Sequence, residues 1–232
     1  MKKNIKEIVI LIVCLLLIVL VFIFGMVYIK PAADDIRLIE KGFRNLNQVN
    51  VYAGVKNGRG FIFCVEEEYL DIITSKHLVS EENKVTVEFG NKGQAEAEVL
   101  YYFEDIDAAL IRVKREDSDH DLKGAKGVVT LSKDEYESIA LNKSVFYASD
   151  IYDPSLDVKE GKWYSSSEYI YELGEEVGLF LGEVKPGMSG GALYDEKDRL
   201  VGMIIAADET KGAVIPSYVL DEEYNRFKTI DK

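Results

Sequence analysis

Ser189 is the residue whose sequence neighbours best suit a nucleophile. It stands in the run GMSGG at residues 187–191. Glycine and serine are also the commonest turn residues, so this run alone does not define a chemistry. A serine hydroxyl attacks at neutral pH only when a neighbouring base takes its proton. The role of Ser189 therefore depends on the base that the rest of the chain supplies.

The chain has two histidines, and they lie in different settings. His120 lies in EDSDHD, a charged stretch typical of a solvated loop rather than a metal site. His77 lies in DIITSKHLV, at the end of a strand-like run where a rigid backbone would hold the side chain. A catalytic histidine also needs a carboxylate that fixes its tautomer. Asp107 in EDIDAALIRV, at the entrance of an apolar strand, is the candidate, which gives the chain order His77, Asp107, Ser189.

Composition limits the classes of function. The chain has 232 residues, and 47% of them are hydrophobic, which is enough for a sizeable core. The formal net charge of -13 argues against a nucleic-acid partner, because such partners favour a basic face. We expect no metal and no cofactor. Cys14 and Cys64 are not expected to pair, so the domain would be stabilised by packing rather than by a disulfide.

An uncharged apolar run of about 22 residues occupies positions 8–29. As a helix it would be long enough to cross the hydrocarbon of a bilayer. Three lysines precede this run, so the positive-inside rule places residues 1–7 in the cytoplasm. The sequence thus predicts a single-pass signal anchor in the cell membrane and an extracytoplasmic domain. A cleaved signal peptide, with its site after residues 31–33, remains the alternative.

The rest of the chain changes its pattern near residue 48. Residues 30–47 have apolar positions at helical spacing and are predicted to form a short stalk. Residues 48–232 contain short strand-like runs bounded by glycine and charged turns, which are typical of an all-β fold. The polar segment 115–143 divides these runs into two groups, which favours two packed barrels. A closing helix follows, with Ser217 as its expected N-cap.

Five segments resemble the trypsin-like serine proteases of the bacterial HtrA type. They are GRGFIF, IITSKHLV, DIDAALIRV, KPGMSGGALYDEKDRLVGM and GAVIPSYVL, and together they extend from Gly58 to about Val219. The resemblance implies the chymotrypsin fold, with two packed six-stranded antiparallel β-barrels and a short C-terminal helix. It also implies hydrolysis of peptide bonds through an acyl-enzyme. HtrA proteins usually append PDZ domains, and we expect none here because the chain ends soon after the closing helix.

The resemblance assigns roles to individual residues. His77 would be the general base and then the acid, Asp107 its orienting partner, and Ser189 the nucleophile. The backbone N–H groups of Gly187 and Ser189 would form the oxyanion hole, and glycine suits this position because it adopts backbone angles barred to other residues. Met188 stands where the family has asparagine and cannot supply the same hydrogen bonds. A catalytically silent pseudoprotease, which binds or senses without cutting, is therefore the alternative.

The resemblance also locates the specificity pocket beside the serine loop and the strand that follows it. Ile204, Ile205 and Ala206 would give the pocket an apolar wall that suits a small aliphatic P1 residue. Glu183 could instead form its floor and select lysine or arginine, or be solvated. The expected partners are polypeptide substrates and the membrane through residues 8–29. A homo-oligomer is a further expected partner, and it rests on analogy with the family alone.

Overall fold

The computed structural model describes residues 47–89, 93–117, 125–149, 158–171, 173–207 and 210–231. The predicted tail and anchor, nearly all of the predicted stalk, and His120 lie outside these residues. Among the described residues no helix is both long enough and apolar enough to cross a membrane. Both sheets belong to one compact unit of the chain.

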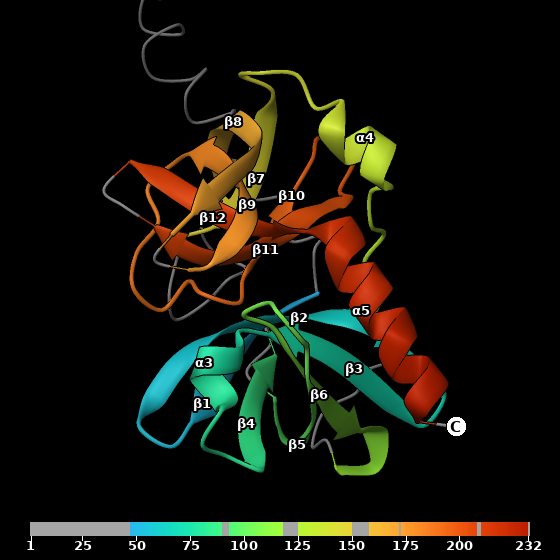
Figure 1. Ribbon diagram of the computed structural model, residues 1–232. Helices are drawn as coiled ribbons and strands as arrows, with labels where there is room; N and C mark the ends of the chain where they lie inside the picture. The colour runs from blue at the N-terminus through green and yellow to red at the C-terminus, as the bar shows by residue number, and fades with distance from the viewer. Residues whose placement is uncertain are drawn as a thin grey trace, which may run out of the picture. The chain divides into compact units, whose positions relative to one another are not determined.

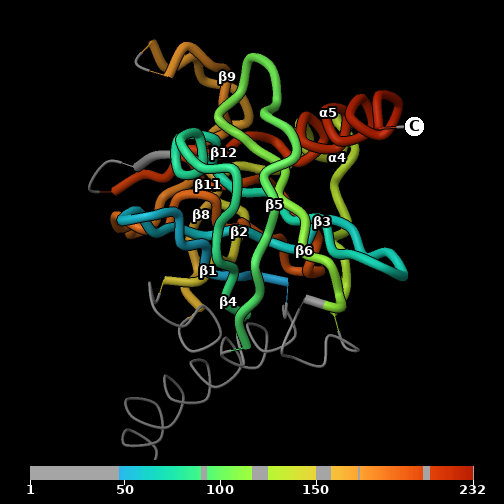
Figure 2. The backbone as a smooth tube through the Cα atoms, turned by 90° about the horizontal axis from the view of Figure 1, so that it is seen from below, coloured from blue at the N-terminus to red at the C-terminus, as the bar shows by residue number. Residues whose placement is uncertain are grey.

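In the part of the chain that the structure describes, twelve strands form two closed antiparallel barrels of six, which confirms the predicted pair of β-barrels (Figure 1). The first barrel has the strand order β1-β2-β3-β6-β5-β4, and the second has β10-β11-β12-β9-β8-β7. Figure 2 views the fold from the side of the first barrel. The strands are β1 (Gln48–Ala53), β2 (Lys56–Val65), β3 (Tyr69–Thr74), β4 (Lys84–Phe89), β5 (Gln94–Tyr102), β6 (Ala109–Lys114), β7 (Ser144–Ala148), β8 (Val158–Ile170), β9 (Glu175–Leu181), β10 (Ala192–Tyr194), β11 (Leu200–Ala207) and β12 (Lys211–Pro216).

Short helices connect or close the barrels. They are α3 (Lys76–Val79), the 3-10 turn η2 (Arg115–Asp117), α4 (Lys133–Glu137) and α5 (Ser217–Ile230). The sequence pattern did not predict α4, which lies in the polar connection between the barrels. Its N-terminus carries a complete capping box, in which Ser132 accepts from the Glu135 backbone and the Glu135 carboxylate accepts from the Ser132 backbone.

The two barrel interiors are filled by different side chains. In the first barrel alternate residues of β4, namely Val85, Val87 and Phe89, point inward and join a largely aliphatic core. In the second barrel the core is rich in aromatic residues, and the Tyr136 and Trp163 rings meet edge to face at 5.4 Å. Each barrel is thus a packed body of its own, able to fix the loops at its rim.

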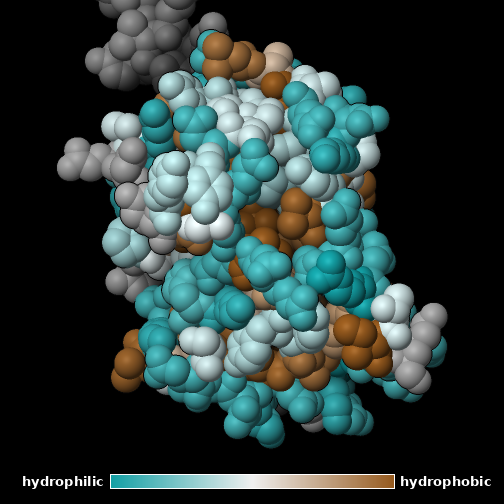
Figure 3. Space-filling view, viewed as in Figure 1, coloured by the Kyte–Doolittle hydropathy of each residue, from teal (hydrophilic) through white to brown (hydrophobic). Residues whose placement is uncertain are grey.

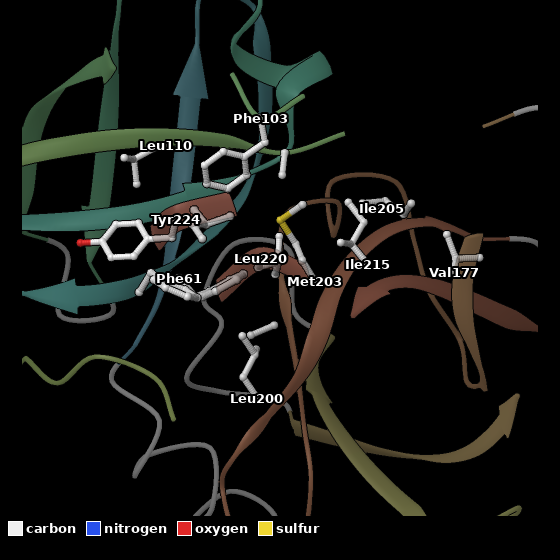
Figure 4. Packing of buried hydrophobic residues seen from close by; sticks show 14 of the residues in the cluster. Phe61, Phe103, Leu110, Val177, Leu200, Met203, Ile205, Ile215, Leu220 and Tyr224 are labelled. Carbon is white, nitrogen blue, oxygen red and sulfur yellow. The ribbon is translucent and has the colours of Figure 1, made fainter. Parts of the chain in front are cut away.

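A third apolar cluster lies where the barrels meet. It joins Phe61, Phe103 and Leu110 of the first barrel to Met203 and Ile215 of the second (Figure 4). The face drawn in Figure 3 shows apolar residues in the hollow between the barrels and mainly polar residues around it. The barrels are therefore packed directly against each other, and residues at their junction have fixed positions.

The C-terminal helix α5 connects the second barrel to the first. It follows β12 directly, and Leu220 and Tyr224 on its inner face enter the cluster between the barrels. The Tyr224 hydroxyl donates to Asp71 on β3 at 2.8 Å. The expected N-cap was wrong by one residue, because Pro216 holds the N-cap position and makes no side-chain capping hydrogen bond. The Ser217 hydroxyl instead accepts a hydrogen bond from the Leu131 backbone at 3.1 Å.

Candidate active site

His77 and Asp107 lie together at the rim of the first barrel. β3 ends at Thr74, and His77 follows on the single turn of α3 rather than on the strand itself. His77 Nδ1 lies 2.5 Å from Asp107 Oδ2, and the His77 backbone N–H donates to Oδ1 at 2.9 Å. The Lys76 backbone N–H donates to the Asp107 carbonyl at 3.3 Å. Backbone and side chain thus fix the imidazole and the carboxylate as one unit.

The electrostatic surroundings of His77 favour its protonated form. The hydrogen bond that His77 donates to the Asp107 carboxylate raises the pKa of His77 above its usual 6.5, against a smaller opposing effect of burial. The positive charge of Lys56 also opposes the rise. About half of the His77 side chain is exposed, so the ring is open to an incoming molecule. The Asp107 carboxylate is placed to stabilise an imidazolium.

The Ser189 turn is pressed against the first barrel. The Arg59 backbone N–H donates to the Ser189 carbonyl at 2.9 Å, which joins the turn to β2. Gly190 has φ +85, and a Cβ there would lie 2.0 Å from the Arg59 carbonyl oxygen. Only glycine avoids both the strained backbone and this clash. Glycine is therefore required at position 190, where the two backbones approach closely.

Met188 is buried beneath the turn and belongs to the core of the second barrel. Its sulfur accepts a hydrogen bond from the Lys185 backbone N–H at 3.1 Å, and its own N–H donates to the Lys185 carbonyl at 3.1 Å. Gly187 has φ +90. The N–H groups of Gly187 and Ser189 donate to no other described residue. Met188 thus fixes the loop from below, and both amides remain available to an acceptor.

A small cavity of about 180 Å³ borders these amides. It is lined by Val184, Lys185, Pro186, Gly187, Ser189, Ile204 and Ile205. Two of the predicted pocket residues, Ile204 and Ile205, are therefore present. Glu183 is not among the lining residues, since its exposed carboxylate pairs with Lys185 at 3.2 Å. Ala206 is described by its backbone alone, which pairs with Ala213 on β12.

The Ser189 hydroxyl is hydrogen-bonded, but not to His77. It donates to the Ile205 carbonyl at 3.2 Å and lies 2.8 Å from the Ser75 hydroxyl. Among the described residues these are its two hydrogen-bond partners. Ser75 stands two residues before His77, so Ser189 of the second barrel contacts the first-barrel segment that carries the histidine. Catalytic hydrogen bonds are often loose in a free enzyme and tighten with substrate.

Two residues of this region were not singled out from the sequence. Ser75 lies within IITSKHLV, so its proximity to the site could have been anticipated, although its contact with Ser189 could not. Glu175 begins β9, and burial raises the pKa of its carboxyl, against a hydrogen bond from the Asp107 backbone. Its Oε2 is buried and makes no hydrogen bond with the described residues. Only the packing of the two barrels brings Glu175 to Asp107.

The described residues contain no group of three or more His, Cys, Asp or Glu side chains placed to ligate a metal. The groups that the two barrels bring to this region are an imidazole, a carboxylate, a hydroxyl and two backbone donors. Chemically, such a set can pass a proton from the hydroxyl to the ring and stabilise an oxyanion.

Two packed six-stranded barrels with this junction are the architecture of the trypsin-like peptidases. A family model described as "Trypsin-like peptidase domain" matches residues 58–203, which is more than half of the chain. The chain belongs to this family. Comparison with the curated proteins gave no significant match.

Solved structures show the same fold at low sequence identity. The Rv3671c protease of M. tuberculosis, in its inactive form, is 20% identical, with a TM-score of 0.59 over 79% of this chain and 90% of that one. The serine endoprotease from Yersinia pestis is 18% identical, with a TM-score of 0.62 over 81% and 65%. An HtrA-type protease solved with a tripeptide is 17% identical, with a TM-score of 0.65 over 81% and 62%.

Proposed function

We propose that the chain is a serine endopeptidase in which His77, Asp107 and Ser189 form the catalytic triad. The observation that carries the proposal is the bond between His77 Nδ1 and Asp107 Oδ2. With the proton on Nδ1 directed at the carboxylate, the Nε2 lone pair is left to accept the proton of Ser189. Membership of the trypsin-like peptidase family supports the same assignment.

The geometry suits acyl transfer in two stages. Ser189 Oγ would attack the scissile carbonyl while His77 Nε2 takes its proton, and Asp107 would stabilise the imidazolium. The N–H groups of Gly187 and Ser189 would donate to the oxyanion. His77 would then return the proton to the leaving amine, and a water activated by the same ring would hydrolyse the acyl-enzyme.

The substrates we propose are exposed or unfolded segments of extracytoplasmic proteins. The cavity beside Ser189 is small, and Ile204 and Ile205 line it, which suits a small aliphatic P1 residue. Selection of lysine or arginine has less support, because Glu183 lies outside the lining. The apolar run 8–29 supports a membrane anchor with the peptidase outside the cytoplasm.

A pseudoprotease is the second candidate. The observation that favours it is the Ser189 hydroxyl, which is hydrogen-bonded to Ser75 and Ile205 rather than to His77. Met188 gives this candidate no further support, because its sulfur stabilises the loop from beneath. In a pseudoprotease the same cavity would bind a peptide without cutting it.

The two candidates are separated by a cleavage assay on the full chain in detergent. Wild type is incubated with an unfolded protein and with peptides that differ at P1, beside Ser189→Ala and His77→Ala. We expect cleavage after small aliphatic residues that both substitutions abolish. Binding of the same peptides by Ser189→Ala shows that this variant is folded. Peptide binding without cleavage by the wild type would reject the endopeptidase and support the pseudoprotease.

A further inference from the structure

Ser75 stands at the N-cap of a helix, but its hydroxyl contacts Ser189 instead of capping the helix. It occupies the N-cap position of α3, where a serine side chain normally accepts a backbone N–H of the first turn. Here its side chain makes no capping hydrogen bond. The residue is fully buried, and its hydroxyl lies 2.8 Å from Ser189 Oγ on the opposite barrel. Contact with the proposed nucleophile therefore replaces the cap.

The direction of the hydrogen bonds follows from counting protons. A carbonyl oxygen only accepts, so the contact between Ser189 and Ile205 requires that Ser189 donate. A hydroxyl has one proton to donate, so Ser75 must donate to Ser189. The arrangement that satisfies both contacts runs from Ser75 to Ser189 to Ile205. It occupies a lone pair of Ser189 Oγ and directs the Ser189 proton away from His77.

We propose that Ser75 is a positioning residue that keeps Ser189 in a resting orientation and slows its acylation. The inference rests on the proposed function, because it concerns the same nucleophile. For attack, the Ser189 proton must leave the Ile205 carbonyl and turn to His77 Nε2, and Oγ must free a lone pair for the substrate carbonyl. The hydrogen bond from Ser75 stabilises the resting state and is lost or weakened on the way to attack.

Loss of the Ser75 hydroxyl should therefore make Ser189 more reactive. The full chain in detergent is titrated with a fluorophosphonate probe, and the rate of labelling is measured for wild type, Ser75→Ala and Ser75→Cys. Ser75→Ala is expected to label roughly two- to tenfold faster than wild type, which corresponds to one ordinary hydrogen bond. Ser75→Cys, whose thiol is a weak donor of similar shape, is expected to fall between the two.

Ser217→Ala is the matched control. Ser217 is also fully buried and its hydroxyl also has a hydrogen-bond partner, but it lies at the start of α5. The same substitution there removes a buried hydroxyl without touching Ser189, so labelling should proceed at the wild-type rate. Thermal unfolding of each variant shows how much stability the substitutions remove, and labelling is counted per folded chain.

A second readout is the NMR titration of His77, which shares the spectrum with one other histidine. In Ser75→Ala the Ser189 hydroxyl loses a hydrogen bond that stabilises its resting orientation, so it should turn from the Ile205 carbonyl to neutral Nε2 more often. The pKa of His77 should then be lower than in wild type. This shift together with faster labelling supports the inference. Equal or slower labelling of both Ser75 variants, with Ser189 labelled in wild type, overturns it and leaves the endopeptidase standing. No labelling of any folded variant overturns both.

Discussion

The two barrels differ in how far their side chains are already arranged for the proposed reaction. On the first barrel, His77 and Asp107 are already joined, side chain to side chain and backbone to side chain. On the second barrel, the Ser189 backbone is fixed by the packed turn, while its hydroxyl is hydrogen-bonded away from the histidine. The proposed base and the proposed oxyanion donors are thus preorganised, whereas the hydrogen bond from Ser189 to His77 is not yet formed. The reaction would then need only a local turn of one side chain.

Asp107→Asn is the strongest test of the first-barrel side. An amide in place of the carboxylate no longer requires a proton on Nδ1, so Nε2 would lose its fixed role as acceptor. We expect kcat to fall by about 10⁴ at neutral pH. Steady-state kinetics on a cleaved peptide measure this effect. A fall of less than tenfold would mean that the pair is structural and that His77 takes its proton without help from Asp107.

Gly190→Ala tests the fixed backbone on the second-barrel side. A Cβ at Gly190 would meet the Arg59 carbonyl at 2.0 Å on a backbone with φ +85. We expect a loss of about 3 kcal/mol or more in the free energy of unfolding, and loss of labelling. Gly174→Ala is the control, because Gly174 also has positive φ but no atom lies within 4 Å of the added Cβ. That variant should lose only about 1 kcal/mol. Equal losses in thermal or denaturant unfolding would contradict the close approach.

Tyr224→Phe tests the connection that α5 makes between the barrels. The Tyr224 hydroxyl donates to Asp71, which is fully buried and also pairs with Arg112. Loss of one hydrogen bond to a charged group is expected to cost about 1.5–3 kcal/mol in denaturant unfolding. Labelling of Ser189 should persist wherever the chain is folded. An unchanged stability would show that the packing of α5 alone joins the two barrels.

The pH dependence of labelling tests the state of the base. Acylation needs neutral His77, and the Asp107 hydrogen bond raises its pKa, so labelling should increase with pH through a midpoint above 6.5. Because the folded-state pKa is raised, protonated His77 stabilises the fold fully below pH 6.5. That contribution is lost as pH rises through the folded-state pKa. A midpoint below 6.5 in wild type would contradict the His77–Asp107 pair.

The motifs of the sequence predicted much of the fold and part of the site. Strand-like runs bounded by turns predicted both barrels, because inward and outward residues alternate along a strand. The sequence also placed His77 at the end of a strand-like run, and the structure has it on α3, just after β3 ends at Thr74. α4 was missed, although SKDE at residues 132–135 is a capping-box pattern.

Other features could not be predicted because they depend on how the barrels pack. The contact of Ser75 with Ser189 joins residues 114 positions apart. The position of Glu175 beside Asp107 brings the start of β9 to the turn that precedes β6 on the other barrel. Glu183 was a candidate for the pocket floor because of its distance from Ser189 along the chain. Its side chain pairs with Lys185 instead, and the spacing of residues along the chain does not predict that ion pair.

The most direct test of the account is to find which residue a fluorophosphonate modifies. The full chain in detergent is labelled at pH 8, digested, and mapped by mass spectrometry, with His77→Ala treated in parallel. The account predicts one adduct, on Ser189, that is absent from His77→Ala. An unmodified Ser189 in a folded wild-type chain, or an adduct that forms equally well without His77, would contradict it.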